Sequence, residues 1–458
     1  MLNTLTDDTN GAITISTMDK EGLDKSLAAA PARERAWLKT LGFNADPGKF
    51  AFLPGSDGRP NKVVVGANLK RDPIWALAGL PETLPEGRYR LDARLDRERA
   101  TKIALGWALG AYAFTRYKKP KRGFATLVWP DRADRKEVER LAQGVFLARD
   151  LINTPAEDLG PPELAAAASK VARRYEAGCT VISGGDLLKK NYPTIHAVGR
   201  ASSRPPCLID LRWGKKNAPK VTLVGKGVCF DTGGLDLKPA ANMLQMKKDM
   251  GGAAVVLGLA SALMSAKAPI RLRVLIPAVE NSVSANAIHP LDIVRTRSGK
   301  TVEIGNTDAE GRLILCDALA EADSESPSLL IDCATLTGAA RVALGPEVQA
   351  LFCNHDKVAD AILRASVDVA DPIWRLPLWK PYRKMIDSKI ADFNNVADGP
   401  FAGSIIGALY LAEFVRESTP WAHLDIMASN TRSRPGRPEG GEATGLRALY
   451  RAIRQRFG

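Results

Sequence analysis

From about residue 221 to residue 427 of this 458-residue chain, short apolar segments of strand character alternate with apolar segments of helical character. Such alternation predicts a mostly parallel sheet with helices on both faces, because a helix must cross over the sheet between parallel strands. Ligands of these sheets bind at the carboxyl ends of the strands. The predicted strands are residues 221–224, 272–279, 329–333, 348–353 and 421–427, and the predicted helices are residues 250–265 and 313–322.

The amino-terminal part of the chain predicts a separate and smaller α/β domain. Residues 62–66 and 125–129 have strand character, and residues 97–114 show the apolar spacing of a helix. Residues 1–30 are polar and rich in turn formers, so we expect them to be loosely held. The amphipathic residues 133–153 predict one long helix that ends before a proline. The predicted organisation is an α/β domain over residues 1–130, a connecting helix over residues 131–153, and a large domain over residues 154–458 whose mostly parallel central sheet is flanked by helices.

Composition excludes several classes of protein. Apolar residues make up 45% of the chain and charged residues 25%, which is typical of a globular protein and not of a disordered one. The longest weakly polar run, residues 251–266, is too short and too rich in glycine and serine to span a membrane. The first residues lack the basic and apolar stretches of a signal peptide, so we expect a cytoplasmic protein. The six cysteines have no C-x-x-C spacing and are expected to be free thiols.

The formal net charge is +13, and residues 1–150 hold 26 Lys and Arg against 19 Asp and Glu. The densest basic stretch, residues 116–122, includes a tyrosine. Such a stretch can contact the phosphates of a nucleic acid, or it can be an ordinary solvated loop. Nucleic-acid binding therefore stays open as an alternative function.

Common catalytic motifs are absent from the sequence. There is no G-x-x-x-x-G-K-[ST] phosphate loop and no G-x-S-x-G nucleophile motif. The four histidines lie far apart, without the spacing of a histidine-ligated zinc site. We expect them to be structural, with His423 making a hydrogen bond inside its strand.

Two segments combine carboxylates, lysines and glycines at predicted strand ends. The first has the sequence VGKGVCFDTGGLDLK over residues 224–238 and continues with MKKDMGG over residues 246–252. The second is NTDAEGR over residues 306–312, just ahead of an apolar helix. Several carboxylates near one another can hold two divalent cations.

Local structure offers an alternative reading of the same residues. Thr307 and Glu310 have the spacing of a helix capping box, and Asp249 precedes a helix as an N-cap residue would. Residues 231–234 can form an ordinary turn. Composition and spacing alone therefore predict a carboxylate-rich cleft that can bind metal, and no more.

Taken together, the segments resemble the leucyl aminopeptidase family of dinuclear cytosolic metallopeptidases over roughly residues 145–450. The motif NTDAEGR is close to diagnostic, and VGKG, FDTGG and KKDMGGAA occur in the family's order and spacing. The resemblance implies a metal-dependent aminopeptidase, a hydrolase that removes the amino-terminal residue of peptides with a metal-bridging hydroxide.

The resemblance also implies the metal ligands, for two divalent cations in each subunit. A lysine can ligate a metal only as the neutral amine, so the pKa of Lys226 would have to be lowered by the cations. Mn²⁺ or Zn²⁺ is expected, although oxygen donors also suit Co²⁺ and Mg²⁺. The implied ligands are Lys226, Asp231, Asp249 and Glu310 for one cation, and Asp231, Glu310 and Asp308 for the other.

The resemblance implies catalytic roles for two further side chains. Lys238 would stay protonated near the carbonyl oxygen of the substrate, and Arg312 would hold a bicarbonate ion that acts as general base. The pocket for the amino-terminal side chain of the substrate would include Met246, Thr335, Leu336, Gly338 and Met427.

The chain departs from the family pattern after Asp425, where Ile-Ala-Gly is usual and Ile426-Met427-Ala428 stands instead. A methionine in the pocket would make it smaller or reshape it, which puts a preference for leucine in doubt. The resemblance further implies peptide substrates and a homohexamer. An inactive homologue is disfavoured because all seven metal and catalytic positions are filled, and a cysteine hydrolase using Cys229 is the remaining alternative.

Overall fold

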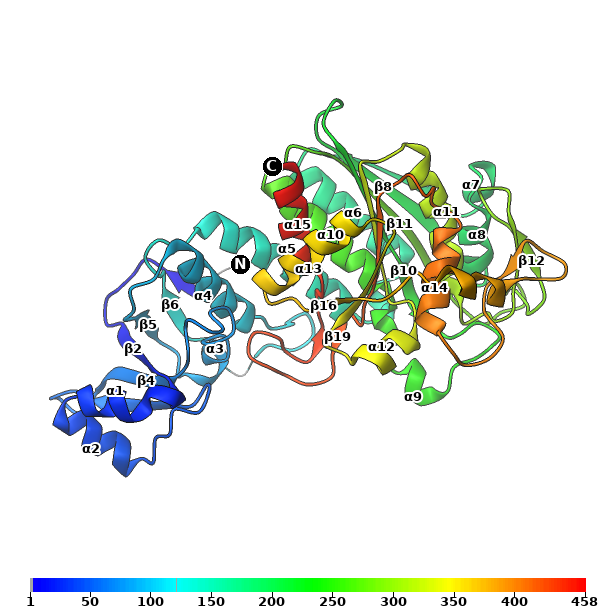
Figure 1. The fold of residues 1–458 in the computed structure, drawn as a ribbon. Helices are drawn as coiled ribbons and strands as arrows, with labels where there is room; N and C mark the ends of the chain where they lie inside the picture. The colour runs from blue at the N-terminus through cyan, green and yellow to red at the C-terminus, as the bar shows by residue number, and fades with distance from the viewer. Residues whose placement is uncertain (1–2, 121) are drawn as a thin grey trace. The chain divides into compact units, whose positions relative to one another are not determined.

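The computed structural model describes residues 3–120 and 122–458. The chain forms two compact units, which are considered separately (Figure 1). The first unit runs to Gln143 and also includes Arg432–Glu439, and the second comprises Gly144–Thr431 and Gly440–Gly458. The division falls inside the long helix α5 (Arg135–Asn153).

The first unit is built on a sheet with the strand order β1-β6-β5-β2-β4-β3. All neighbours in this sheet are parallel except β3 and β4, which are antiparallel. The helices beside it are α1 (Leu23–Ala29), α2 (Ala32–Thr40), α3 (Leu80–Thr83) and α4 (Arg97–Gly110), with the short 3₁₀ helix η1 (Lys20–Gly22). The strands are β1 (Leu5–Thr6), β2 (Ile13–Met18), β3 (Phe50–Pro54), β4 (Pro60–Gly66), β5 (Arg88–Leu91) and β6 (Thr126–Val128).

The expectation that residues 1–30 are loosely held is wrong for the described part of that segment. Strand β2 lies between β4 and β5 in the middle of the sheet, and Ile15 on it is fully buried. Only one of its six residues is buried, so the sequence carries a weak apolar signal there. Hydrogen bonds to strands on both sides hold β2 in place.

The second unit contains a larger sheet with the order β16-β15-β18-β14-β9-β11-β8-β7, and β10 pairs with β11. The central neighbours β18, β14, β9 and β11 are parallel, as are β10 with β11 and β15 with β16, whereas β7, β8 and β15 make antiparallel pairs. Its strands are β7 (Gly178–Ser183), β8 (Cys207–Trp213), β9 (Lys220–Gly225), β10 (Gly227–Asp231), β11 (Arg271–Asn281), β14 (Leu329–Ala334), β15 (Gln349–Cys353), β16 (Ile373–Arg375) and β18 (Trp421–Asp425).

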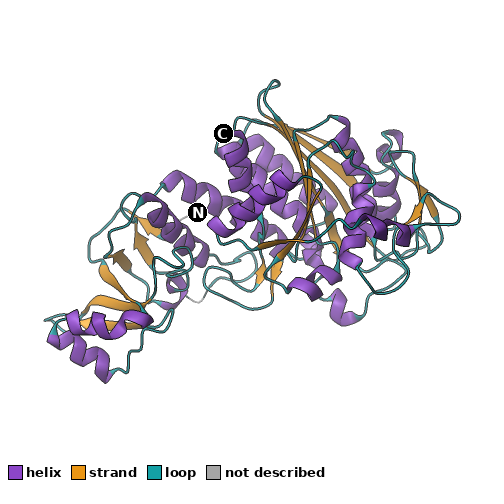
Figure 2. Ribbon diagram, in the orientation of Figure 1, coloured by secondary structure: helices purple, strands orange, loops and turns teal. Residues whose placement is uncertain are grey.

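Helices cover both faces of this sheet, so the predicted α/β class with a mostly parallel sheet is confirmed (Figures 1 and 2). One face carries α6 (Pro161–Arg174), α10 (Gly251–Ser265), α13 (Asp356–Asp368) and α15 (Leu446–Phe457), and the other carries α8 (Pro193–Gly199), α11 (Glu310–Ser324) and α14 (Gly403–Ala412). The remaining elements are α7 (Asp186–Lys189), α9 (Ala240–Met243), α12 (Gly338–Leu344), η2 (Ala156–Asp158), η3 (Met246–Met250), η4 (Lys380–Ile386), and the small ladders of β12 (Ile293–Arg295), β13 (Thr301–Glu303) and β17 (Phe393–Asn394) and of β19 (Ser429–Asn430) and β20 (Gly440–Gly441).

Helix α10 illustrates why this core forms. Its residues from Gly251 to Met264 are all buried, and small side chains dominate it. A helix that is apolar all round is stable only inside a core, where burial contributes about 25 cal/mol for each Å² of apolar surface. Although α10 is apolar, none of the described helices is both long and apolar enough to cross a membrane.

The free thiols and the hydrogen bond predicted for His423 are confirmed. All six cysteines are free thiols. His423 on β18 is fully buried, and its Nδ1 lies 2.6 Å from Oδ1 of Asp332 on β14. The other carboxylate oxygen of Asp332 accepts a hydrogen bond of 2.7 Å from Nε1 of Trp421. This histidine therefore joins two neighbouring strands within the core.

Candidate functional site

Three adjacent parallel strands, β9, β14 and β18, end at the same edge of the large sheet. Ala334 is paired with Asp425 at the ends of β14 and β18. Lys226 directly follows β9, and its backbone N–H donates to the carbonyl oxygen of Cys333 on β14 at 3.0 Å. Thr335 directly follows β14. The residues after the three strands are therefore neighbours, at the place where parallel sheets bind ligands.

The side chain of Lys226 points into a buried cluster of acids. Its Nζ lies 2.7 Å from Oδ2 of Asp249 and 2.9 Å from Oε1 of Glu310, and it donates a 2.9 Å hydrogen bond to the carbonyl oxygen of Thr335. Burial disfavours a charge on this amine, but the carboxylates of Asp249, Glu310 and Asp231 outweigh burial and raise the pKa of Lys226. In the metal-free protein Lys226 is therefore an ammonium group.

Lys238 makes a second bridge of the same kind. Its Nζ lies 2.8 Å from Oδ2 of Asp231 and also contacts Oδ1 of Asp308. Burial opposes its charge, and the two acids outweigh burial, so the pKa of Lys238 is raised. The side chain remains 12% exposed, and a bound substrate can therefore reach it.

Local hydrogen bonds fix the orientation of two of the acids. Oδ1 of Asp231 accepts hydrogen bonds from the backbone N–H of Gly233 at 2.8 Å and from Nδ2 of Asn281 at 2.9 Å. Oδ1 of Asp249 accepts a 2.7 Å hydrogen bond from Oγ1 of Thr335. In both residues the second carboxylate oxygen faces a lysine.

Neither helix-cap interpretation of the acids is correct. The N-cap residue of α11 is Ala309 and that of α10 is Met250, and neither helix has a side-chain cap. Oγ1 of Thr307 instead donates a 2.6 Å hydrogen bond to the carbonyl oxygen of Gly233. Thr307 thus ties the second motif to the glycine-rich turn of the first.

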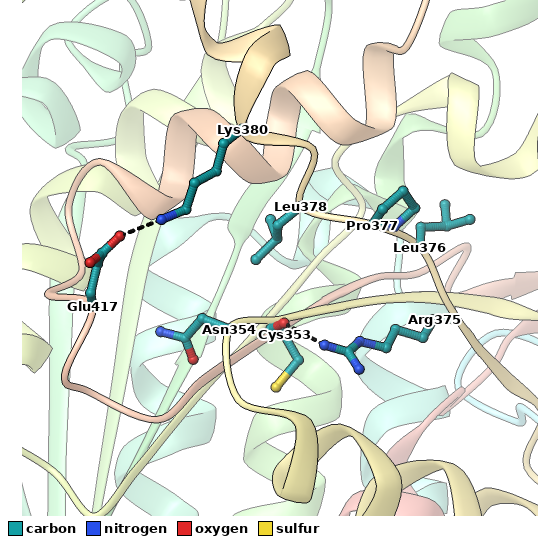
Figure 3. A pocket seen from close by; sticks show the side chains of 8 residues that line it. All are labelled: Cys353, Asn354, Arg375, Leu376, Pro377, Leu378, Lys380 and Glu417. Atoms are coloured by element: carbon teal, nitrogen blue, oxygen red, sulfur yellow. Dashed lines mark hydrogen bonds and ion pairs between the residues drawn. The ribbon is translucent and has the colours of Figure 1, made fainter.

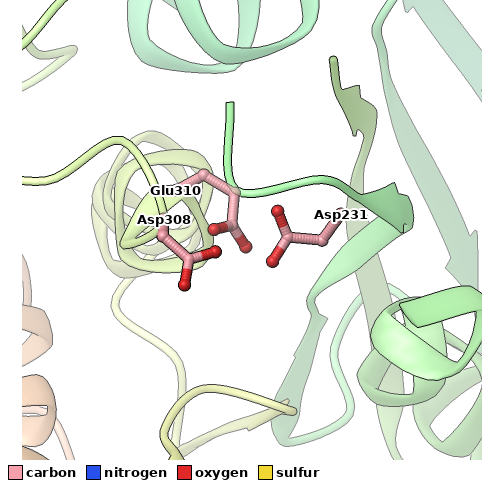
Figure 4. Close-up of side chains that lie close together, drawn as sticks. All are labelled: Asp231, Asp308 and Glu310. Carbon is pink, nitrogen blue, oxygen red and sulfur yellow. The ribbon is translucent and has the colours of Figure 1, made fainter. Parts of the chain in front are cut away.

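Asp231, Asp308 and Glu310 point toward one another from two segments, the end of β10 and the residues that lead into α11 (Figure 4). One oxygen of each lies within 4.8 Å of the others. Burial, reinforced by the charge of Asp231, raises the pKa of Glu310 to about 8 and that of Asp308 to about 6. Burial also opposes the charge of Asp249, but Lys226 and Lys248 outweigh it and lower the pKa of Asp249. A bound cation would relieve the mutual repulsion of these carboxylates, so the cluster favours cation binding.

The donor atoms fit a pair of divalent cations. Oε2 of Glu310 is buried and has no hydrogen-bond partner within the described part of the chain. A buried carboxylate oxygen without a partner is costly unless it binds a cation. A Cβ on Gly311 would lie 2.6 Å from Cε of Lys226, so only glycine leaves room for that lysine. Carboxylate oxygens and one amine are ligands suited to Mn²⁺ and Zn²⁺.

Arg312 is buried beside this cluster and has no carboxylate partner among residues 3–120 and 122–458. One of its terminal nitrogens donates to the carbonyl oxygen of Asn395, while Nε has no hydrogen-bond partner in the described chain. Burial lowers the pKa of Arg312. A buried cation without an acid partner favours binding of a small anion.

The residues predicted for the side-chain pocket lie in segments at this edge of the sheet, and they differ in burial and in their contacts. Thr335 is buried and contacts Asp249, and the backbone N–H of Leu336 donates to Oδ1 of Asp425 at 3.0 Å. Met427 is partly buried, and its N–H donates to Oε1 of Gln349 at 3.0 Å. Met246 opens η3 ahead of Asp249, and Gly338 opens α12.

Sequence reasoning missed two residues that position the site, Asn281 and Asn395. Asn281 ends β11 and holds Asp231 from 50 residues away, and no signal in the sequence marks it. Asn395 holds Arg312 through its carbonyl oxygen, and its Nδ2 donates to the carbonyl oxygen of Asn306 at 2.8 Å. Its position in the sequence ADFNN (residues 391–395), outside both acid-rich segments, gave no signal for this role.

A separate surface cavity of about 710 Å³ lies elsewhere on the second unit (Figure 3). Within it Lys380 Nζ pairs with Glu417 at 2.6 Å, and Arg375 donates to the carbonyl oxygen of Cys353 at 3.2 Å. None of the predicted site residues lines it, so we assign it no part in catalysis. The lining residues are Cys353, Asn354, Arg375, Leu376, Pro377, Leu378, Lys380 and Glu417.

Comparison with known families gives two matches that together span most of the chain. Residues 146–450 match the catalytic domain of the cytosol aminopeptidase family, and residues 13–130 match the N-terminal domain of M17 aminopeptidases.

Individual relatives agree with the family match. A probable cytosol aminopeptidase of Roseiflexus castenholzii is 41% identical over 382 residues, which is 78% of this chain and 76% of that protein. The crystal structure of a cytosol aminopeptidase from Coxiella burnetii is 48% identical and superposes with a TM-score of 0.95 over 99% of both chains. The bottromycin maturation enzyme BotP in complex with Mn is 34% identical, with a TM-score of 0.88 over 98% of this chain and 100% of that one.

Proposed function

The chain belongs to the M17 cytosol aminopeptidase family and is a metal-dependent aminopeptidase, and we propose that its cluster of buried acids and lysines is the metal centre. The observation that carries this proposal is the close approach of the three acids in Figure 4, together with the buried Oε2 of Glu310, which has no hydrogen-bond partner in the described chain. The proposed ligands are Lys226, Asp231, Asp249, Asp308 and Glu310.

Two bound divalent cations would supply an acidified water nucleophile and polarise the scissile carbonyl of the peptide. Mn²⁺ and Zn²⁺ are the proposed ions, and the manganese complex of BotP supports manganese for a relative. Lys226 must release its proton to ligate a cation. The positive charge of the cation opposes the effect of the acids that raise the pKa of this lysine.

Lys238 is the proposed electrostatic stabiliser of the reaction. It keeps its proton, because Asp231 and Asp308 both stabilise the ammonium group. From its partly exposed position it can donate to the carbonyl oxygen of the substrate as negative charge develops there. Fixed donors of this kind need no reorganisation during the reaction.

Arg312 is the proposed holder of a bicarbonate ion. Its buried guanidinium lacks a carboxylate partner in the described chain, which supports an anion at this position. A bicarbonate there would take up a proton from the attacking water, so the chain itself need not provide a general base.

The pocket for the amino-terminal side chain of the substrate is proposed to include Met246, Thr335, Leu336, Gly338 and Met427. The contact of Thr335 with Asp249 supports a pocket directly beside the metal ligands. Met427 stands two residues after the end of β18.

A cytoplasmic location and a homohexamer are proposed as well. The names of the relatives support the location. Large apolar side chains on the second unit are available for contacts between subunits: Leu244 is 76% exposed, Val342 90% and Phe401 78%. The matches give no support to the nucleic-acid alternative.

Crystals soaked in manganese test the metal centre. We expect two anomalous peaks between Asp231 and Glu310, and the absence of a pair there would refute the assignment. In parallel, protein freed of metal by a chelator should cleave aminoacyl amides only after Mn²⁺, Zn²⁺ or Co²⁺ is restored, and N-acetylated substrates should resist cleavage because their amine is blocked.

A further inference from the structure

Two basic side chains beside the proposed side-chain pocket have no acidic partner. Lys248 lies on η3, one residue before Asp249, and Arg341 lies on α12, three residues after Gly338. Neither side chain makes an ion pair or a hydrogen bond with any residue in the ranges 3–120 and 122–458. Both positions fall outside the proposed metal ligands.

Arg341 reaches toward the start of its own helix. Its Nη2 lies 3.9 Å from the position that a Cβ on Gly338 would occupy, and it is the nearest atom to that position. Its Nη1 is buried and has no hydrogen-bond partner in the described chain. The guanidinium thus lies beside Gly338, and its Nη1 is available to a ligand.

Lys248 is only 4% exposed. Burial lowers the pKa of Lys248 to about 8, and the two acids that act in the opposite direction, Asp249 and Asp425, already have other partners. Asp249 pairs with Lys226 and accepts from Thr335, as described above. Asp425 accepts hydrogen bonds from the backbone N–H groups of residues 336 and 337 and from Oγ1 of Thr337. Neither acid makes an ion pair with Lys248 in the described chain.

The two side chains flank Thr335, because Lys248 directly precedes Asp249, to which Thr335 donates, and Arg341 reaches Gly338, three residues after Thr335. Lys248 is buried and Arg341 is partly buried, and two positive charges held near each other without an ion-pair partner repel each other at a cost in free energy. One carboxylate bound between them would remove the repulsion and accept hydrogen bonds from both side chains. A guanidinium binds a carboxylate with paired hydrogen bonds.

We propose that Lys248 and Arg341 bind the side-chain carboxylate of the substrate's amino-terminal residue, so that the enzyme prefers peptides beginning with Glu or Asp. This inference rests on the proposed function, because it takes the segments that begin at Met246 and Thr335 as the walls of the pocket. It agrees with the departure at Met427, which makes a simple leucine pocket doubtful.

The ratio of kcat/KM for glutamyl and glutaminyl amides tests the preference. These substrates have nearly the same shape and differ in one charge, and neither has a free terminal carboxylate that could bind the cations instead. With the manganese-loaded protein we expect the ratio to favour the glutamyl amide by roughly tenfold or more. Aspartyl and asparaginyl amides should show the same sign.

Variants identify the residues responsible. Arg341→Met should lower the Glu/Gln ratio by roughly tenfold, and Arg341→Lys should retain part of the preference because it keeps the charge. Lys248→Met should lower the ratio as well, although its buried position next to Asp249 makes loss of folding a risk for that variant. Arg341 is partly exposed, which makes it the safer test. The matched control is Arg364→Met, at an exposed arginine of α13, which should leave the ratio unchanged.

The outcomes separate this inference from the proposed function. A general loss of catalysis in Arg341→Met would lower both rate constants and leave their ratio unchanged, which would overturn the inference. An enzyme that cleaves leucyl and glutaminyl amides but shows no advantage for the glutamyl amide would also overturn it while leaving the aminopeptidase assignment intact. Failure to cleave any amide after metal loading would overturn both.

Discussion

Nζ of Lys226 and Oδ2 of Asp249 lie 2.7 Å apart, and both side chains are almost fully buried. The two residues come from different segments, one following β9 and the other preceding α10. Their contact brings the two halves of the first motif together at the end of the sheet. Removing the acid from such a pair leaves a buried ammonium group with one fewer partner, which is strongly unfavourable.

Asp249→Ala should therefore lose bound metal and activity together. The variant lacks one proposed ligand, and Lys226 is drawn more strongly to Glu310, where it competes with a cation. Metal content measured by atomic spectroscopy should fall in parallel with turnover. A variant that keeps two metal ions and normal turnover would show that Asp249 is not a ligand.

Lys238→Ala should lower turnover without loss of bound metal. Its proposed role is to stabilise the developing oxyanion, and loss of one such donor typically lowers kcat by about 10²–10³. Two acids lose an ammonium partner in this variant, so metal binding should be retained. Lys357→Ala, at an exposed lysine of α13, is the control. Unchanged turnover in Lys238→Ala would refute the oxyanion role.

Local motifs explain why most of the site could be predicted. Lys226 and Asp231 belong to one short segment, and Asp308, Glu310 and Arg312 belong to another, so the two motifs and their resemblance to the family carry the information. The alternation of strands and helices then places both segments at strand or helix ends, and the structure agrees.

Contacts between distant segments explain what could not be predicted. Asn281 is 50 residues from Asp231, and Asn395 is 83 residues from Arg312. The lack of a hydrogen-bond partner for Nη1 of Arg341 among the described residues becomes evident only when its neighbours in space are known. Strand β2 was missed for a related reason, because its stability comes from pairing on both sides and not from its own apolar pattern.

Asp317 provides a test of pH dependence at a distance from the metal ligands. It is fully buried on α11, where its two oxygens accept from the backbone N–H groups of Arg297 at 2.7 Å and Thr194 at 2.9 Å. Burial raises its pKa from 3.8 to about 6, although these donors act in the opposite direction. Between about pH 4 and pH 6 the folded protein retains a proton that the unfolded chain has released. The contribution of Asp317 to stability therefore falls as pH rises through this window.

Asp317→Asn removes this titration. The free energy of unfolding of the wild type minus that of the variant should decrease by on the order of 3 kcal/mol from pH 4 to pH 7. Denaturant unfolding at several pH values measures the difference, with Asp360→Asn at an exposed position as control. A difference that stays constant or increases with pH would contradict the shift.

Ala428 and Gly251 restrict each other at the start of α10. Ala428 has a positive φ of 55°, which is rare for a residue with a side chain, and a Cβ on Gly251 would lie 2.2 Å from its methyl group. Gly251→Ala should therefore cost about 1–3 kcal/mol of stability by overpacking. It should also weaken metal binding, because Asp249 lies two residues away. Ala428→Gly alone should change stability by less than about 1 kcal/mol, since relief of strain and the greater freedom of the unfolded chain oppose each other.

The double variant decides whether this contact is the cause. With glycine at position 428, the nearest atom to a Cβ at position 251 is Cγ2 of Thr335 at 3.5 Å, which is ordinary van der Waals contact. The double variant should recover most of the stability and metal affinity that Gly251→Ala loses, so the two substitutions should not be additive. Gly185→Ala is a suitable control because a Cβ there meets no atom within 4 Å, and its effect should simply add to that of Ala428→Gly. Additive losses at positions 251 and 428 would instead mean that Gly251 is required for the conformation of its own backbone and not for room beside Ala428.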